Sequence, residues 1–245
     1  WRQLATERGG TVITISAPGD GDWGTAVIDS IDDRTAVVAL PHCLWTDGSL
    51  IDLERVSDAC KQNSAALVID ATQSLGALPF DVTLVKPDFL ISACYKWLLG
   101  PYSLGFIYVS PEHQNGQPLE QTWIGRENSE DFSGLINYRD TFQPGARRFD
   151  VGERSNFALM PVARSSLELI REWGVDRIAG TLGALTYDIA TRAQSLGLTS
   201  QPEGLRASHF LGIRFPDGMP PDLVEKLSAA GVHVSVRGTA MRVTP

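Results

Sequence analysis

The sequence predicts an α/β protein whose central sheet is mostly parallel. Short, continuous apolar runs, typical of fully buried strands, recur through the first 110 residues. Segments with apolar residues at helical spacing lie between these runs, and turn residues separate the two kinds of segment. Buried strands joined by helices form a parallel sheet with helices on both faces, so we expect that architecture here.

The elements of the first 110 residues follow from residue type and spacing. Thr11–Ile15 is rich in β-branched residues and predicts a first strand. Apolar residues at helical spacing predict two helices, and in the second of them Leu53, Val56 and Cys60 form one apolar stripe. The full set of expected elements is strands at 11–15, 35–40, 65–69, 89–94 and 104–109, and helices at 23–31 and 52–62.

The second half of the chain changes character. Residues 111–154 are polar, lack periodicity and are too long for a plain connection, so we expect a functional segment or a packing arm. Further on, Gly197 is a plausible helix stop. The expected elements are helices at 158–173, 176–196 and 222–230, and strands at 209–215 and 232–236. We therefore predict a large domain with connecting helices over residues 1–196 and a small, incomplete α+β domain over 197–245.

Composition excludes several classes of protein. The chain has 245 residues and a net charge of −8, which argues against nucleic-acid or anionic-membrane partners. No apolar run approaches the length of a membrane span. Three cysteines without a C-x-x-C pair predict neither disulfides nor a metal site and suit the cytoplasm. Because the chain opens on Trp1, without a methionine, we interpret it as a fragment.

An acid and a lysine follow two of the expected strands. Asp70 ends the run Ala66-Leu67-Val68-Ile69, and Lys96 follows Phe89-Leu90-Ile91 by a few residues. Ligands of parallel sheets bind outside the carboxyl ends of the strands, where these side chains fall. Pyridoxal phosphate (PLP) needs such a pair, since a lysine amine forms a Schiff base with its aldehyde and an acid keeps its pyridine nitrogen protonated. Each residue alone is weak evidence; the two together predict a PLP site.

The segments Val68-Ile69-Asp70-Ala71-Thr72-Gln73 and Tyr95-Lys96-Trp97-Leu98-Leu99-Gly100-Pro101 resemble the cofactor motifs of class V aminotransferases. That superfamily of fold-type-I PLP enzymes includes cysteine desulfurases, selenocysteine lyases and kynureninases. The resemblance implies a fold-type-I large domain, with Asp70 on the pyridinium nitrogen, Gln73 on the phenolic oxygen and Lys96 as the Schiff-base lysine. Tyr95 is similar to the kynureninase tyrosine that contacts the cofactor phosphate. The role of Ser92 stays open: it either lies near the phosphate or satisfies the end of its strand.

Four further residues receive roles from the same resemblance. Trp123 and Asn156 lie in segments similar to those that reach the cofactor phosphate from the neighbouring kynureninase subunit, although a hydrophobic anchor and a helix cap explain them equally well. Arg242, in Met241-Arg242-Val243-Thr244-Pro245, is similar to the arginine that binds the substrate carboxylate, with Arg237 as a competitor. His42 either contacts substrate or is satisfied by backbone groups in a turn.

These residues predict a PLP-dependent enzyme acting on an amino acid, a small-molecule substrate, and working as a homodimer with shared active sites. Aminotransferase is the first choice; the alternatives are a kynureninase-like hydrolase or a selenocysteine or cysteine Cβ–S(e) lyase, and, in another class, an inactive binding protein with the PLP fold. Cysteine desulfurases carry a nucleophilic cysteine on a loop shortly before the arginine strand. Residues 231–240 contain none, so we expect no desulfurase activity.

Overall fold

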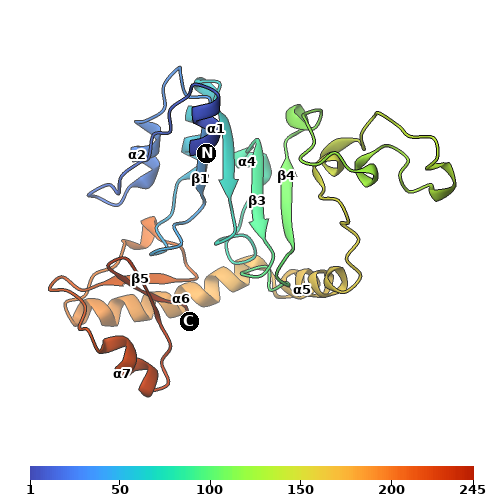
Figure 1. Cartoon of the computed structure of the whole chain (residues 1–245). Helices are drawn as coiled ribbons and strands as arrows, with labels where there is room; N and C mark the ends of the chain where they lie inside the picture. Colours follow the sequence, from blue (N-terminus) through green and yellow to red (C-terminus); the bar gives the residue numbers. More distant parts are fainter.

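The computed structural model describes all 245 residues, and a four-stranded sheet with the order β1-β2-β3-β4 forms its centre (Figure 1). The strands are β1 (Val37–Pro41), β2 (Ala66–Asp70), β3 (Phe89–Ala93) and β4 (Gly105–Val109). The first three strands run parallel, and β4 is antiparallel to β3. The prediction of a mostly parallel sheet is confirmed, and each of its four strands was expected within two residues of its bounds.

Helices connect the parallel strands and supply the core. α3 (Leu53–Gln62) joins β1 to β2, and α4 (Val82–Val85) joins β2 to β3. The Asp52 carboxylate accepts the Arg55 N–H and so caps the start of α3. The predicted stripe of α3 is buried against the strands and against α2 (Trp23–Ile28). The opposite face of the sheet is less covered, since Ile91 is 38% exposed.

The N-terminal segment corrects one prediction. Only α1 (Arg2–Glu7) is regular before α2, and Thr11–Ile15 is not a strand. A strand needs a neighbour that accepts and donates its backbone hydrogen bonds, and no backbone hydrogen bond within the chain involves these five residues. Their β-branched side chains are also not enclosed, since Ile13 is 69% exposed. Residue type favoured a strand, but these residues pair with no strand of the sheet.

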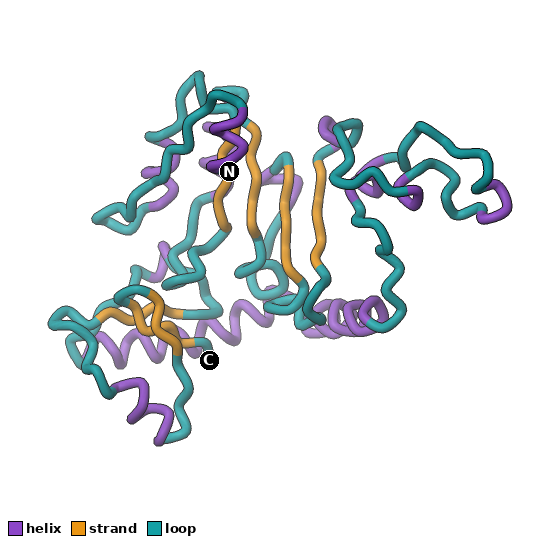
Figure 2. The backbone as a smooth tube through the Cα atoms, viewed as in Figure 1, coloured by secondary structure: helices purple, strands orange, loops and turns teal.

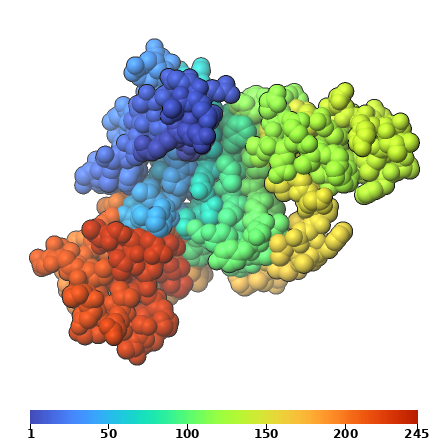
Figure 3. Space-filling model, viewed as in Figure 1, coloured from blue at the N-terminus to red at the C-terminus, as the bar shows by residue number.

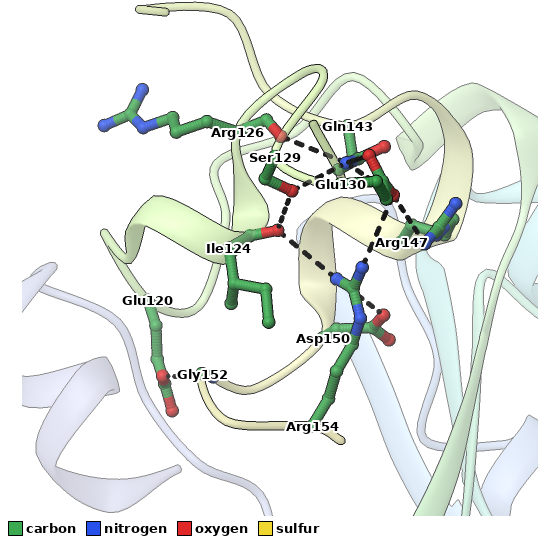
Figure 4. Close-up of polar contacts among 10 residues, drawn as sticks. All are labelled: Glu120, Ile124, Arg126, Ser129, Glu130, Gln143, Arg147, Asp150, Gly152 and Arg154. Atoms are coloured by element: carbon green, nitrogen blue, oxygen red, sulfur yellow. Dashed lines mark hydrogen bonds and ion pairs between the residues drawn. The ribbon is translucent and has the colours of Figure 1, made fainter. Parts of the chain in front are cut away.

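Residues 111–154 form an arm that extends from β4, away from the C-terminal sheet (Figure 2). As predicted, the arm has no α-helix or strand; it contains η1 (Pro111–His113), η2 (Trp123–Gly125), η3 (Phe132–Gly134) and η4 (Gly145–Phe149). A polar network holds it together (Figure 4). The Glu130 carboxylate binds Arg147 at 2.9 Å, Arg154 at 3.8 Å and the Gln143 amide at 3.1 Å. Side-chain pairing thus replaces an apolar core in this segment.

Two long helices follow the arm, α5 (Leu159–Trp173) and α6 (Val175–Ser195). The end of α6 has the Schellman pattern, because Leu198 N–H donates to Ala193 O and Gly197 N–H donates to Gln194 O. Gly197 has φ +78°, which confirms its predicted role as the helix stop.

A second, antiparallel sheet lies against α6, with the strand order β5-β7-β6. Its strands are β5 (Leu211–Arg214), β6 (Ser235–Arg237) and β7 (Ala240–Val243), and η5 (Glu203–Leu205) and α7 (Leu223–Ala229) complete this part. β5 begins two residues later than expected because its pairing with β7 starts at Leu211, and the buried His209 and Phe210 lie before it. Figure 3 shows this part, in red, on the opposite side of the molecule from the arm. A domain boundary at residue 197 stays a prediction. No helix combines the length and low polarity needed to cross a membrane.

Candidate active site

The carboxyl ends of the parallel strands bring the predicted acid and lysine to one edge of the sheet. Pro41, the last residue of β1, lies in register with Asp70 of β2, and Asp70 lies in register with Ile91 of β3. Past these positions the backbone still pairs, because His42 N–H donates to Asp70 O and Ala71 N–H donates to Ile91 O. The turns that follow each strand therefore start from fixed positions.

Two hydrogen bonds fix the turn after β2. The Asp70 carboxylate accepts the Thr72 N–H at 2.9 Å, and the Thr72 hydroxyl accepts the Ala93 N–H at 3.0 Å. The second bond ties this turn to the end of β3. Asp70 stays solvent-exposed at the edge, where its second oxygen is free to meet a ligand. Thr72 is a residue of the motif whose role the sequence did not suggest.

Two glycines allow the Lys96 loop to close tightly. A Cβ at Gly100 would lie 2.2 Å from Cys94 Sγ, and one at Gly76 would lie 2.4 Å from Trp97 O. Gly100 N–H donates to Cys94 O and Leu99 N–H donates to Lys96 O, so residues 94–100 form a compact turn. Gly76 lets the turn after β2 lie directly against this loop.

Gln73, His42 and Cys43 gather behind the acid. Gln73 is buried, and its backbone oxygen accepts hydrogen bonds from Cys43 Sγ at 3.4 Å and from His209 Nε2 at 2.5 Å. His42 packs edge-on to Phe80, and burial lowers the pKa of His42 to about 4. The sequence left His42 open between a substrate contact and a backbone-satisfied turn residue. Its Nδ1 is buried without a hydrogen-bond partner, whereas a turn residue satisfied by backbone groups would have one.

Arg242 reaches the same region from β7. Its guanidinium donates to Trp45 O at 3.2 Å and lies 4.5 Å from the ring centre of Phe210. Burial lowers the pKa of Arg242, and the positive charge of Arg237 lowers it further. Arg237 itself is exposed and lies 5.7 Å from the Trp45 ring centre. The two candidate arginines are thus neighbours, and Arg242 is the more enclosed.

Charge interactions connect these groups to Lys96. Partial burial lowers the pKa of the Lys96 amine, and the Arg242 guanidinium lowers it further, whereas the Asp70 carboxylate opposes both effects. A lysine with a lowered pKa is more often unprotonated and is then a nucleophile. Acid, amine and guanidinium therefore share one electrostatic environment.

Tyr95 lies at the surface beside the lysine. It is 39% exposed and stacks on Tyr102 with ring centres 4.3 Å apart, while Lys96 Nζ lies 5.7 Å from its ring centre. Ser92 is buried in β3, and its hydroxyl donates to Ala93 O at 3.3 Å. That contact is the strand-end role considered for Ser92.

Trp123 and Asn156 are not part of this group. Trp123 lies in the arm, 41% exposed, edge-on to Phe132. The Asn156 side chain accepts the N–H groups of Ala158 and Leu159 and so caps the start of α5, which is the local role that the sequence also allowed. Their predicted reach into the site of a neighbouring subunit stays a prediction.

The polar groups present fit PLP. Asp70, Gln73 and Lys96 supply a carboxylate, an amide and an amine at one edge of the sheet. Gln73 Oε1, His42 Nδ1 and Arg242 Nε are each buried without a hydrogen-bond partner in the chain. Buried polar atoms normally have partners, so a ligand with several polar groups suits this region. A cavity of about 480 Å³ lies instead beside Trp97, lined by Gly76 and by residues of α5 and α6, and Asp70 and Lys96 do not line it.

Comparison with known proteins agrees with the motifs. The family model described as aminotransferase class-V matches residues 1–242, so the chain belongs to the class V aminotransferase family. The family is PLP-dependent, and the predictions of family, fold-type-I architecture and cofactor are confirmed at this level.

Individual relatives are distant and differ in activity. The chain is 29% identical over 191 residues to an uncharacterized aminotransferase, YcbU, from Bacillus subtilis strain 168, covering 72% of this chain and 49% of that protein. It is 26% identical over 211 residues to a kynureninase from Geobacillus thermodenitrificans strain NG80-2, covering 86% and 45%. The apo cysteine desulfurase of Thermococcus onnurineus NA1 superposes with a TM-score of 0.80 at 20% identity, covering 100% of this chain and 64% of that one. The chain thus spans about half the length of the curated relatives it matches.

Proposed function

We propose that this chain carries the cofactor and substrate residues of a PLP-dependent enzyme that acts on an amino acid. The observation that carries the proposal is the convergence of Asp70 and Arg242 on Lys96, since the charges of both residues act on its amine. Bound PLP supplies an aldehyde that joins amines and a ring that withdraws electrons from the substrate. The chain supplies the groups that hold this cofactor and move protons beside it.

Lys96 is the proposed attachment point and base. Its pKa is lowered by partial burial and by Arg242, so the amine loses its proton more readily than that of a solvated lysine. With PLP bound, the Lys96 Nζ would serve as the base that takes the proton from the substrate Cα. The compact turn of residues 94–100 restricts where Nζ can move.

Asp70 and Gln73 are proposed to hold the ring. A carboxylate stabilises a proton on the pyridine nitrogen, which the amide of an asparagine would not do. The Oε1 of Gln73 is buried without a hydrogen-bond partner. The resemblance assigns the side-chain amide that carries this atom to the phenolic oxygen of the ring. Tyr95 is proposed to contact the phosphate.

Arg242 is proposed to bind the substrate carboxylate, and His42 to contact substrate. A guanidinium offers two parallel N–H groups that match a carboxylate. Burial favours this role for Arg242 over Arg237, since a partly desolvated charge binds an opposite charge more strongly. His42 stays uncharged at neutral pH because burial lowers its pKa to about 4, so it would act as a neutral hydrogen-bonding group.

The arm is proposed to pair with a second copy of the chain. Several of its large apolar side chains are exposed, among them Phe132 at 74%, Ile136 at 83% and Tyr138 at 90%. Exposed apolar groups of this size mark interaction surfaces. A homodimer with shared sites would bring Trp123 and Asn156 to the partner's cofactor. Light scattering on the active full-length protein tests this, and an active monomer would contradict it.

Amine transfer is the favoured activity, with kynureninase-like hydrolysis or Cβ–S(e) cleavage as the alternatives. Desulfurase activity is disfavoured because all three cysteines of the chain are buried. Burial raises the pKa of Cys43 to about 12 and of Cys60 to about 11, and it raises the pKa of Cys94. Thiols in that state are poor nucleophiles. Sulfide release from L-cysteine that disappears on Cys43→Ser or Cys94→Ser would reverse this view.

The decisive experiment is reduction of the PLP-loaded full-length protein with borohydride, followed by peptide mapping. The pyridoxyl group should lie on Lys96, whereas label on Lys61 or Lys86 would refute the assignment. Protein that takes up no PLP would favour the inactive binding protein instead. Product analysis with amino acids and a keto-acid acceptor then separates amine transfer from hydrolysis and Cβ–S(e) cleavage.

A further inference from the structure

The segment before β5 is fixed to the turn after β1 by a series of backbone contacts. Leu50 N–H donates to Leu205 O at 2.9 Å, Ala207 N–H donates to Gly48 O at 2.7 Å, and Gly212 N–H donates to Asp47 O at 3.0 Å. A Cβ at Gly212 would lie 2.5 Å from Asp47 Cβ, so only glycine permits this approach. Arg214 also forms an ion pair with the buried Asp47. The residues between these anchor points have little freedom.

His209 lies at the middle of this segment and is fully buried. Its Nε2 lies 2.5 Å from the Gln73 backbone oxygen, 136 residues away in sequence. A carbonyl oxygen only accepts hydrogen bonds, so Nε2 must carry the proton and donate it. The His209 ring also meets Trp97 edge-on, with ring centres 4.5 Å apart at 88°. One side chain therefore touches the backbone of Gln73 and the residue next to Lys96.

Phe210 extends this contact to the substrate side. Its ring lies 4.9 Å from that of His209, and its face lies 4.5 Å from the Arg242 guanidinium carbon. Thr186 of α6 anchors the residue before His209, because its hydroxyl donates a hydrogen bond to Ser208 O at 2.8 Å. The His209-Phe210 pair is thus packed between the proposed cofactor residues and the proposed substrate arginine.

We propose that His209 is a positioning residue of this site: its Nε2–H holds the Gln73 carbonyl, its ring fixes Trp97, and together these contacts set Gln73 and Lys96 relative to Arg242. The inference rests on the proposed function, since Gln73 and Lys96 are its proposed cofactor residues. His209 does not reach the cofactor itself. Its Nδ1 is buried and unpartnered, and a residue retained only for packing would not need a polar ring there.

Two substitutions separate the hydrogen bond from the packing. His209→Gln keeps an N–H donor at a similar reach, whereas His209→Leu has a comparable size and no donor. His233→Leu, at an exposed position, is the matched control. The measurements on the full-length protein are the dissociation constant for PLP and, without cofactor, hydrogen exchange of peptides covering residues 71–78 and 94–100.

We expect His209→Leu to weaken PLP binding about tenfold, the effect of one lost buried hydrogen bond, and to speed exchange in both peptides. His209→Gln should restore binding to within about threefold, and His233→Leu should match the wild type. Wild-type values for His209→Leu, or equal losses for Leu and Gln, would overturn the proposal. Wild-type protein that fails to bind PLP would instead refute the proposed function, and the exchange measurement would still report on His209.

A measurement on the unsubstituted protein covers the case in which His209→Leu does not fold. Nitrogen-15 spectra of the imidazole groups at neutral pH should show one histidine with a slowly exchanging proton on Nε2, and that signal should disappear in His209→Gln. A His209 ring protonated on Nδ1 alone could not donate to Gln73 and would overturn the proposal without any variant.

Discussion

Acidification should destabilise this protein well before its carboxyl groups titrate. Burial lowers the pKa of both His42 and His209 from 6.5 to about 4, so both stay neutral in the folded chain at about pH 5. In the unfolded chain each has its ordinary pKa and binds a proton below pH 6.5. The unfolded state therefore binds more protons, and the free energy of unfolding falls as the pH falls from 6.5 toward 4.

The expected size follows from the two pKa values. At about pH 5 an unfolded histidine is mostly protonated, and the difference from pH 7.5 is about 2 kcal/mol for each fully buried ring. His209 should reach this value because it is fully buried, and the nearby charge of Arg242 disfavours its protonation further. His42 is only partly buried, so its share is the smaller. Together they should lower the stability by about 3–4 kcal/mol.

Carboxyl groups with lowered pKa values act on stability below this window. Hydrogen bonds from Thr25 and Thr83 lower the pKa of the Asp22 and Asp81 carboxyl groups, which stabilise the fold above their unfolded pKa near 4. Their contribution is lost only as the pH falls further. Burial raises the pKa of Cys43 to about 12 and of Cys60 to about 11, so neither thiol titrates in this window.

Urea unfolding of the cofactor-free protein at pH 7.5 and pH 5 measures the change. His209→Gln should remove about half of the pH dependence, whereas His233→Gln, at an exposed site, should leave it unchanged. Equal stability at the two pH values, within about 1 kcal/mol, would show that the two rings are not buried as neutral groups. An unchanged slope in His209→Gln would assign the effect to other residues.

Three further predictions concern the site and its support. Asp70→Asn should retain PLP but lower turnover by about 100-fold or more in steady-state assays, because a neutral amide does not hold the ring proton; near-normal turnover would mean that another acid has this role. Arg242→Ala should lower kcat/KM by about tenfold or more and Arg237→Ala by less than about threefold, and the reverse order would exchange their roles. Gly212→Ala should cost about 2–3 kcal/mol in urea unfolding, since its Cβ would lie 2.5 Å from Asp47 Cβ, and a loss below about 0.5 kcal/mol would show that the contact is easily relaxed.

The sequence predicted the central sheet because its signals are local. Apolar runs such as Ala66–Asp70 form strands whose neighbours are the next strands in the chain, so the parallel order follows from the pattern. Asp70 and Lys96 were found for the same reason, since each follows its own strand. Thr11–Ile15 has the same local signal, yet no strand lies beside it to pair with. Residue type alone does not report whether a partner is present.

Contacts between distant segments were beyond prediction. His209 stands at the start of an expected strand and looks like an ordinary core residue until Gln73 is seen beside it. Asn156 shows the converse, because its side chain satisfies the next turn of backbone and needs no distant partner to explain it. The residues that position a site are harder to find from sequence than those that act in it, since their role depends on what the fold places next to them.

The motif around Lys96 also contains a positioning residue, Gly100, and the segment that resembles the family includes it. Leu99 adopts a positive φ of 54°, and Gly100 comes so close to Cys94 Sγ that any side chain at this position would collide with it. This close approach lets the turn that carries Lys96 close, with Gly100 N–H donating to Cys94 O and Leu99 N–H donating to Lys96 O. A glycine four residues after the lysine is therefore required by the backbone and not by the chemistry. The resemblance in this segment is specific because it combines an amine with the glycine that the turn around it requires.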